Sequence, residues 1–139
     1  MISTDEALLD IDAVHAFLTR SYWATGIPHD LVAKAIRNSL PFGLYVDGRQ
    51  IGFARVISDS VTYAYVADVY VEEEHRSKGL ALKLMEAVRG HPDLRGLRRW
   101  MLGTKDAHGL YRKVGFQNVE IPERWMEISD PDVYTRGAA

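Results

Sequence analysis

The spacing of apolar residues along the chain predicts one central unit, a strand followed by a helix. Residues 61–71 are β-branched, aromatic or apolar almost throughout, which is typical of a strand buried on both faces. From Gly79 onward, Leu80, Leu84 and Val88 recur at helical spacing, which predicts an amphipathic helix. A short basic turn, residues 75–79, joins the two.

Turn and cap residues divide the rest of the chain. Asp10 or Asp12 caps a first helix, Pro41 ends a second, and Asp47-Gly48 is the preferred pair for a tight hairpin. The predicted elements are helices at 10–20 and 29–39, strands at 42–46, 49–57 and 61–71, a helix at 79–90, a strand at 98–103, a helix at 106–114, and strands at 116–119 and 125–128. Gly115 is expected at the C′ position of the last helix. A helix crossover makes strands 61–71 and 98–103 parallel, whereas the earlier strands are antiparallel. This order predicts a single α+β domain over residues 1–139.

Composition narrows the classes of function. The 139 residues are 47% apolar, which suffices for one core, and the net charge of −2 with dispersed signs disfavours a nucleic-acid partner. No stretch has the pattern of a signal peptide or a membrane span, so a cytoplasmic protein is expected. The absence of cysteine excludes disulfides and a thiol nucleophile, and the five scattered histidines predict no metal site.

The turn before the central helix has the features of an anion site. Free backbone N–H groups and the positive end of the helix dipole meet there, and Arg76 and Lys78 add charge. Neither the Walker motif nor the dinucleotide fingerprint is present. The turn instead has the form Arg76-x-x-Gly79-x-Ala81, in which two small residues let the backbone approach a pyrophosphate. The alternative is an exposed polar turn without a ligand.

With a second motif, Leu110-Tyr-x-x-x-Gly-Phe116, the chain resembles the GNAT superfamily of acyl-CoA-dependent N-acetyltransferases over essentially its whole length. The resemblance implies a mixed, mostly antiparallel sheet flanked by helices. It also implies that the parallel strands splay apart at the cofactor site, with a bulge near residues 68–70. Thr104 departs from the family, since many members have asparagine there.

The cosubstrate implied by this resemblance is acetyl-CoA, without a metal. The backbone of residues 77–81 would bind its pyrophosphate, Arg76 or Lys78 its 3′-phosphate, and strand residues 69–71 its pantetheine amides. The predicted cofactor-binding residues are Val69, Tyr70, Val71, Arg76, Ser77, Lys78, Gly79, Leu80, Ala81, Thr104 and His108.

Without cysteine, direct attack by the acceptor amine is the simplest mechanism. Tyr111, from the second motif, is the candidate acid for the leaving thiolate; its alternative role is packing on the sheet. Asp68 is the candidate base, because a carboxylate in an apolar strand is costly unless it is solvated or paired. Glu127, His108 and a water relay remain alternatives for the base, and Asp68 has the alternative role of a hydrogen-bond acceptor from backbone or arginine.

The acceptor is expected to be a small-molecule or peptide amine. Its candidate pocket residues are Tyr22, Trp23, Arg55, His108, Trp125 and Glu127. The adjacent aromatics Tyr22 and Trp23 have the alternative role of capping the core. Two other functions stay open, a CoA-binding sensor without turnover and an anion- or nucleotide-binding domain unrelated to CoA. A homodimer is also compatible with the resemblance.

Overall fold

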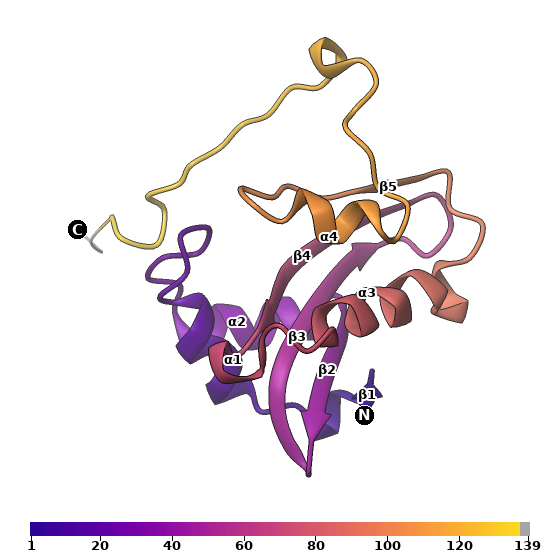
Figure 1. Ribbon diagram of the computed structural model, residues 1–139. Helices are drawn as coiled ribbons and strands as arrows, with labels where there is room; N and C mark the ends of the chain where they lie inside the picture. The colour runs from indigo at the N-terminus through magenta and orange to yellow at the C-terminus, as the bar shows by residue number, and fades with distance from the viewer. Residues whose placement is uncertain (137–139) are drawn as a thin grey trace.

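The computed structural model describes residues 1–136 as helices packed on both faces of a five-stranded sheet (Figure 1). The strands lie in chain order, β1 (Ile2–Ser3), β2 (Leu40–Val46), β3 (Arg49–Ser58), β4 (Tyr63–Val71) and β5 (Arg99–Met101). All neighbours are antiparallel except β4 and β5, which are parallel. The predicted α+β class, with a mostly antiparallel sheet, is confirmed; β1 was not predicted.

In the described part of the chain, four helices cover the sheet. They are α1 (Ile11–Leu18), α2 (His29–Arg37), α3 (Leu80–Gly90) and α4 (His108–Arg112), with short 3₁₀ turns η1 (Glu6–Leu8), η2 (Glu73–His75), η3 (Pro92–Leu94) and η4 (Pro122–Arg124). Asp10, not Asp12, caps α1, because its carboxylate accepts the backbone N–H of Ala13. Gly115, at a φ of 101°, ends α4, with Phe116 N–H bonded to Tyr111 C=O as in a Schellman motif.

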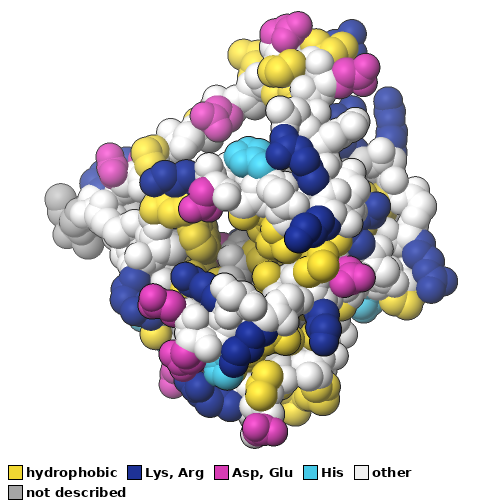
Figure 2. Space-filling model, viewed as in Figure 1, with side chains coloured by type: hydrophobic (Ala, Val, Ile, Leu, Met, Phe, Trp, Pro, Cys, Tyr) yellow, Lys and Arg dark blue, Asp and Glu magenta, His cyan; other side chains and the backbone are white. Residues whose placement is uncertain are grey.

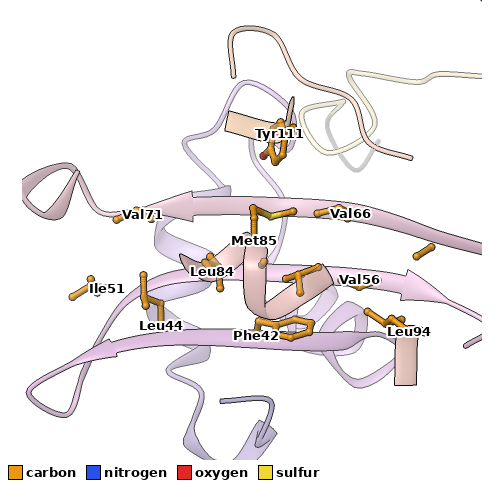
Figure 3. Close-up of a cluster of buried hydrophobic side chains, with 13 residues drawn as sticks. Phe42, Leu44, Ile51, Val56, Val66, Val71, Leu84, Met85, Leu94 and Tyr111 are labelled. Carbon is orange, nitrogen blue, oxygen red and sulfur yellow. The ribbon is translucent and has the colours of Figure 1, made fainter. Parts of the chain in front are cut away.

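Two hydrophobic clusters form on opposite faces of the sheet. Along β3, Phe53 belongs to the cluster under α1 and α2, whereas Ala54 and Val56 belong to the larger cluster under α3. In that larger cluster Leu84 and Met85 of α3 lie against strand residues (Figure 3). The sheet is therefore covered on both sides, and the site must lie at an edge or a gap between strands.

The central strand differs from its prediction in one respect. Its first half is not buried on both faces, since Tyr63 and Tyr65 are 36% and 38% exposed while Ala64 and Val66 between them are buried. The alternation arises because helices cover only one face of β4 near its start. β5 and α4 are also shorter than the predicted ranges 98–103 and 106–114.

The predicted strands at 116–119 and 125–128 are wrong for this chain. Residues 117–136, called the arm below, leave the body, turn at η4 and pass back toward the α1–α2 end of the molecule without strand pairing (Figure 1). Met126 and Ile128 are 97% and 104% exposed. A β-pattern alone does not make a strand, because the ladder needs a partner edge that this arm does not reach.

Within residues 1–136, no helix has the length and apolar character needed to cross a bilayer.

Candidate active site

The parallel strands separate early, as predicted. β4 and β5 pair only at Tyr63–Tyr65 with Arg99–Met101, so the rest of β4, to Val71, has no partner on that side among residues 1–136. On the other side, β3 pairs Phe53 with Tyr70 and Arg55 with Ala67, which leaves Asp68 and Val69 together opposite Ala54. Asp68 has a φ of 57°, the left-handed conformation that marks this bulge. The strand thus offers unpaired backbone N–H and C=O groups where it bends.

A cleft of about 660 Å³ opens at this bulge. Its walls come from the α1–α2 loop, the centre of β4, the β5–α4 loop and the arm. The lining residues are Tyr22, Trp23, Ala24, Ile27, Arg55, Tyr65, Val66, Ala67, Asp68, Val69, Gly103, Thr104, Lys105, Asp106, Ala107, Tyr111 and Tyr134. The structure therefore brings together Tyr22, Trp23, Arg55, Asp68 and Tyr111, which the sequence predicted for one site.

Tyr111, on α4, belongs to the larger hydrophobic cluster (Figure 3) and also lines the cleft; it is 8% exposed. Burial is the largest cause that raises the pKa of its phenol, and together with the nearby Tyr22 and Asp106 groups it brings this pKa to about 12. No group in residues 1–136 hydrogen-bonds the hydroxyl. The phenol is thus protonated at neutral pH and free to donate its proton into the cleft.

Asp68 is held by two donors from different elements. Its Oδ2 accepts a hydrogen bond from Arg55 Nε at 2.8 Å, and its Oδ1 accepts one from Trp23 Nε1 at 2.9 Å. The side chains of Arg55 and Asp68 are only 18% and 10% exposed. Because both carboxylate oxygens are engaged, Asp68 fixes the positions of the indole and the guanidinium in the cleft wall.

Aromatic side chains build the wall around this pair. Tyr22 and Trp23 pack edge to face with ring centroids 5.0 Å apart, and Lys105 Nζ lies 5.3 Å from the Tyr22 ring centre. Tyr70 turns away from the cleft and stacks on Phe17 at 3.9 Å, under α1. Only the backbone of Tyr70 is therefore available on the open side of β4.

The turn before α3 has the expected open form. Ser77 and Gly79 have φ values of 65° and 74°, and a Cβ placed on Gly79 would meet nothing within 4 Å. The first α3 bond runs from Lys83 N–H to Gly79 C=O, so the N–H groups of residues 80–82 have no helical acceptor. Lys78 is exposed. On the face of the molecule drawn in Figure 2, Lys and Arg side chains surround a hollowed apolar area. The free N–H groups of residues 80–82 and the Lys78 ammonium together fit a pyrophosphate.

Arg76 is partly engaged within the chain. Its Nε donates to Val71 C=O at 2.9 Å, which ties the turn to the end of β4. The two Nη atoms of its guanidinium make no hydrogen bond to residues 1–136 and can face a phosphate. Leu80 and Ala81, both half-buried, pack against the core from the first turn of α3.

Other predicted residues occupy different places. Thr104 Oγ1 accepts the N–H of Ala107 at 3.0 Å and lies in the cleft. His108 is exposed and lines a neighbouring hollow together with Thr104 and Tyr111. Trp125 and Glu127 are on the arm, outside the cleft: the Trp125 ring lies 4.5 Å from Arg99 Cζ, and Glu127 is exposed.

Sequence reasoning missed Tyr134. It lines the cleft and a second hollow of about 260 Å³ behind Arg55 and Asp68, and its backbone is near Gly26. No local pattern marks Tyr134, since only the course of the arm brings it back to the α1–α2 loop.

Three potential metal ligands lie close together at the end of β4. Glu72, Glu74 and His75 bring ligand atoms within 4.8 Å of one another. Arg49 contacts both carboxylates, at 2.8 Å to Glu72 and 3.5 Å to Glu74, and so offsets part of their negative charge.

A family profile for an acetyltransferase (GNAT) domain matches residues 37–118, which include the open edge of β4, the α3 turn and Tyr111. The chain belongs to the GNAT acetyltransferase family. A protein of Gibberella zeae assigned as an acetyltransferase is 36% identical over 137 residues, covering 81% of this chain and 76% of its own.

Solved structures agree with this membership. The crystal structure of a GNAT-family protein from Xanthomonas campestris pv. campestris, assigned as an acetyltransferase, is 51% identical, with a TM-score of 0.94 over 97% of this chain and 96% of that one. An acetyltransferase-family protein from Clostridium acetobutylicum, crystallised with acetyl-CoA, shares the fold, with 18% identity and a TM-score of 0.66 over 93% and 96% of the two chains.

Proposed function

We propose that this GNAT protein transfers the acetyl group of acetyl-CoA directly to an amine of a small molecule or peptide. One observation carries the proposal: the unpaired edge of β4, from Val66 to Val71, connects the turn before α3 with the cleft that contains Tyr111. A long CoA thioester needs a phosphate site, an extended strand edge and an acid along its length. The turn before α3, the open edge of β4 and the buried Tyr111 lie in this order.

The binding residues have separate tasks. The N–H groups of residues 77–82 bind the pyrophosphate, and Arg76 and Lys78 bind the 3′-phosphate. The free backbone of Val69–Val71 pairs with the pantetheine amides in the manner of an added strand. Thr104, at the edge of the cleft, has a hydroxyl proton left to donate because its oxygen already accepts from Ala107. The acetyl-CoA complex of the Clostridium protein supports this cosubstrate.

The transfer needs stabilisation of one charge and movement of two protons. As the amine nitrogen forms its bond to the acetyl carbon, a backbone N–H of the Asp68–Val69 bulge stabilises the negative charge on the carbonyl oxygen. The carbon–sulfur bond then breaks, and Tyr111 donates its phenolic proton to the thiolate. The proton lost by the attacking nitrogen leaves through the cleft, and Tyr111 is reprotonated from solvent.

Asp68 fits a positioning role better than that of the base. Both carboxylate oxygens of Asp68 already accept hydrogen bonds, one from Arg55 and one from Trp23, so these two donors fix its place in the cleft wall. Its task in this mechanism is to hold the indole and the guanidinium against the acceptor. The aromatic walls and Arg55 suit an acceptor with an apolar body and an anionic group near its amine.

The test is release of free CoA thiol from acetyl-CoA in the presence of a panel of amines, peptides with free N-termini and amino acids. Amine-dependent thiol release, with an acetylated product by mass spectrometry, supports acetyl transfer. CoA binding without thiol release on any acceptor would instead indicate the sensor function, which the double engagement of Asp68 also fits.

A further inference from the structure

The hollow behind the Arg55–Asp68 pair is continuous with the cleft. It has a volume of about 260 Å³ and lies between α1, α2 and β3, on the face of the sheet that α1 and α2 cover (Figure 1); it is called the α1–α2 hollow below. The residues that line both spaces are Ile27, Arg55, Asp68 and Tyr134. A molecule held in the cleft can therefore extend past the ion pair into the α1–α2 hollow.

Most of the lining of the α1–α2 hollow is apolar. Its apolar residues are Val14, Leu18, Ile27, Leu31, Val32, Ala35, Ile36 and Phe53. On the α2 side Leu31 is 39% exposed and the small residue Ala35 is half-buried, so the chain's own side chains do not fill this space. A dry cavity of about 150 Å³ suffices to bind benzene. The α1–α2 hollow therefore has room for one branched aliphatic or aromatic side chain.

Two opposite charges lie side by side where the two spaces meet. Arg55 Nε donates to Asp68 Oδ2 at 2.8 Å, and both side chains line the cleft and the α1–α2 hollow. A zwitterion that lies along this pair can place its carboxylate at the guanidinium and its ammonium at the carboxylate. An α-amino acid has both of these groups on one carbon atom.

Arg55 has donors to spare for such a carboxylate. Its two Nη atoms make no hydrogen bond to residues 1–136, although the side chain is only 18% exposed. In this part of the chain, Tyr45 Oη is the single side-chain atom that is fully buried without a partner, so the Nη atoms of Arg55 reach open space. Lys34 adds a second positive charge to the α1–α2 hollow, whose only carboxylate among these residues is that of Asp68. An anionic group is thus favoured there.

We propose that the acceptor is a free α-amino acid with an apolar side chain of about the size of leucine or phenylalanine. The side chain fills the α1–α2 hollow, the carboxylate accepts from the Nη atoms of Arg55, and the amine lies beside Asp68 at the bulge. This inference rests on the proposed acetyl transfer to an amine and names the class of the acceptor.

The reaction then gives an N-acetylamino acid and CoA. The ammonium loses one proton to solvent, and the nitrogen bonds to the acetyl carbon and loses a second proton. The carbon–sulfur bond breaks as the sulfur takes a proton from Tyr111, which solvent reprotonates.

Other amines match the charges and the space less well. A peptide N-terminus has an amide in place of the carboxylate, so the Nη atoms of Arg55 and the Lys34 ammonium would lack an anion. The peptide would also have to continue past Ile27 and Tyr134, where the two spaces join. A polyamine would add positive charge beside Arg55 and Lys34.

The first experiment measures binding and does not depend on turnover. L-Leucine is titrated calorimetrically into the free protein and into the protein saturated with CoA, in parallel with L-alanine, L-leucinamide and 3-methylbutylamine. Leucine is expected to bind at least about tenfold more tightly than each of the others, because alanine leaves the α1–α2 hollow empty and the other two lack the carboxylate. Equal affinities, no binding of leucine, or equally tight binding of the dipeptide Leu-Gly would overturn the proposal.

The second experiment fills the α1–α2 hollow from the protein side. Ala35→Leu adds bulk to its wall, whereas Ala33→Leu is the matched control, since Ala33 is also half-buried on α2 but does not line the hollow. Ala35→Leu should weaken leucine binding by at least about tenfold, with the CoA affinity and the circular dichroism spectrum unchanged. Ala33→Leu should bind leucine as the parent chain does. The same leucine affinity in both variants would refute the assignment of the hollow.

Thiol release from acetyl-CoA separates this inference from the proposed function. Leucine-dependent release with N-acetylleucine as product supports both. Leucine binding without any release supports the amino-acid site and counts against acetyl transfer. Release with many amines that depends on neither the side chain nor the carboxylate supports acetyl transfer and overturns the amino-acid assignment.

Discussion

At the scale of single residues, the cleft combines a neutral acid, Tyr111, with a carboxylate, Asp68, that already accepts hydrogen bonds from other side chains. Tyr111 is buried with a pKa of about 12 and no protein partner for its hydroxyl within residues 1–136, whereas both oxygens of Asp68 have donors. The two residues that the sequence assigned to acid and base therefore differ in how free they are to move a proton.

Tyr111→Phe should slow turnover by about 10²–10⁴-fold, because the thiolate then leaves without a donor. The hydroxyl has no bond to the chain in residues 1–136, so the folding free energy at neutral pH and the dissociation constant of acetyl-CoA should change little. Steady-state kinetics together with calorimetric binding check this. Normal turnover in Tyr111→Phe would return Tyr111 to a packing role.

Asp68→Asn separates positioning from base catalysis. Asparagine tolerates the left-handed backbone at this position and keeps one oxygen acceptor, so the bulge should persist. A positioning role predicts that KM for the acceptor rises about tenfold while kcat falls less than about threefold. If kcat instead falls by about a hundredfold or more, Asp68 is the base.

Asp68→Ala serves as the structural comparison. It strains the backbone and leaves Arg55 without its partner in a mostly buried site, so the free energy of unfolding should fall by about 3–5 kcal/mol. Urea unfolding of Asp68→Ala and of the parent chain measures the difference. Equal stability of Asp68→Ala and the parent chain would show that the Arg55 pair contributes little.

The sequence indicated some of the cleft residues and not others. Tyr111 and Asp68 were found because each is marked locally, one by a helix motif and one as a carboxylate in an apolar strand. The contact of Asp68 with Trp23 was not predicted, because Trp23 is 45 positions away and only the fold brings its indole within 2.9 Å. No local sequence pattern marks Tyr134 as a cleft residue, since its place in the cleft depends on the long course of the arm.

At the scale of elements, the turn before α3 is the part of the chain whose change should affect CoA binding most directly. Gly79→Glu should abolish CoA binding by placing bulk and negative charge where the pyrophosphate would lie. Calorimetric titration with CoA measures this loss.

Gly96→Glu is the matched control for that variant. Gly96 has nearly the same φ, 73° against 74°, and equally open surroundings, but it lies between α3 and β5, away from the turn. The backbone strain is therefore the same, about 1–2 kcal/mol, and CoA affinity should be kept. Equal loss of affinity in both variants would assign the effect of Gly79→Glu to strain.

Periodicity predicted the interior elements well and failed at the predicted strands 116–119 and 125–128. The Asp47-Gly48 hairpin, the crossover and α3 follow from local patterns that the neighbouring elements reinforce. The arm has a strand pattern of the same quality, but a strand forms only against a second edge. No local pattern says whether that edge belongs to the same chain.

At the scale of the whole molecule, two buried phenols link stability to alkaline pH. Burial raises the pKa of Tyr70 and of Tyr111 to about 12, above the ordinary value of 10.0. The folded state then holds these protons more tightly than the unfolded state, so stability is full below about pH 10 and falls as pH rises toward 12.

Each phenol should contribute about 2–3 kcal/mol to this fall. Tyr111→Phe is therefore expected to flatten the dependence of the unfolding free energy on pH above about pH 10 relative to the parent chain. Urea unfolding at a series of alkaline pH values checks this. Parallel curves for the two proteins would mean that Tyr111 titrates normally.

The proposed function depends on the open β4 edge and the α3 turn binding a CoA thioester. The most direct test is calorimetric titration of the protein with acetyl-CoA, CoA and ATP at one ionic strength. We expect selective binding of the two CoA species, because ATP offers phosphates to the turn but no pantetheine arm to Val69–Val71. Equal affinity for all three ligands, or no binding of acetyl-CoA, would contradict it.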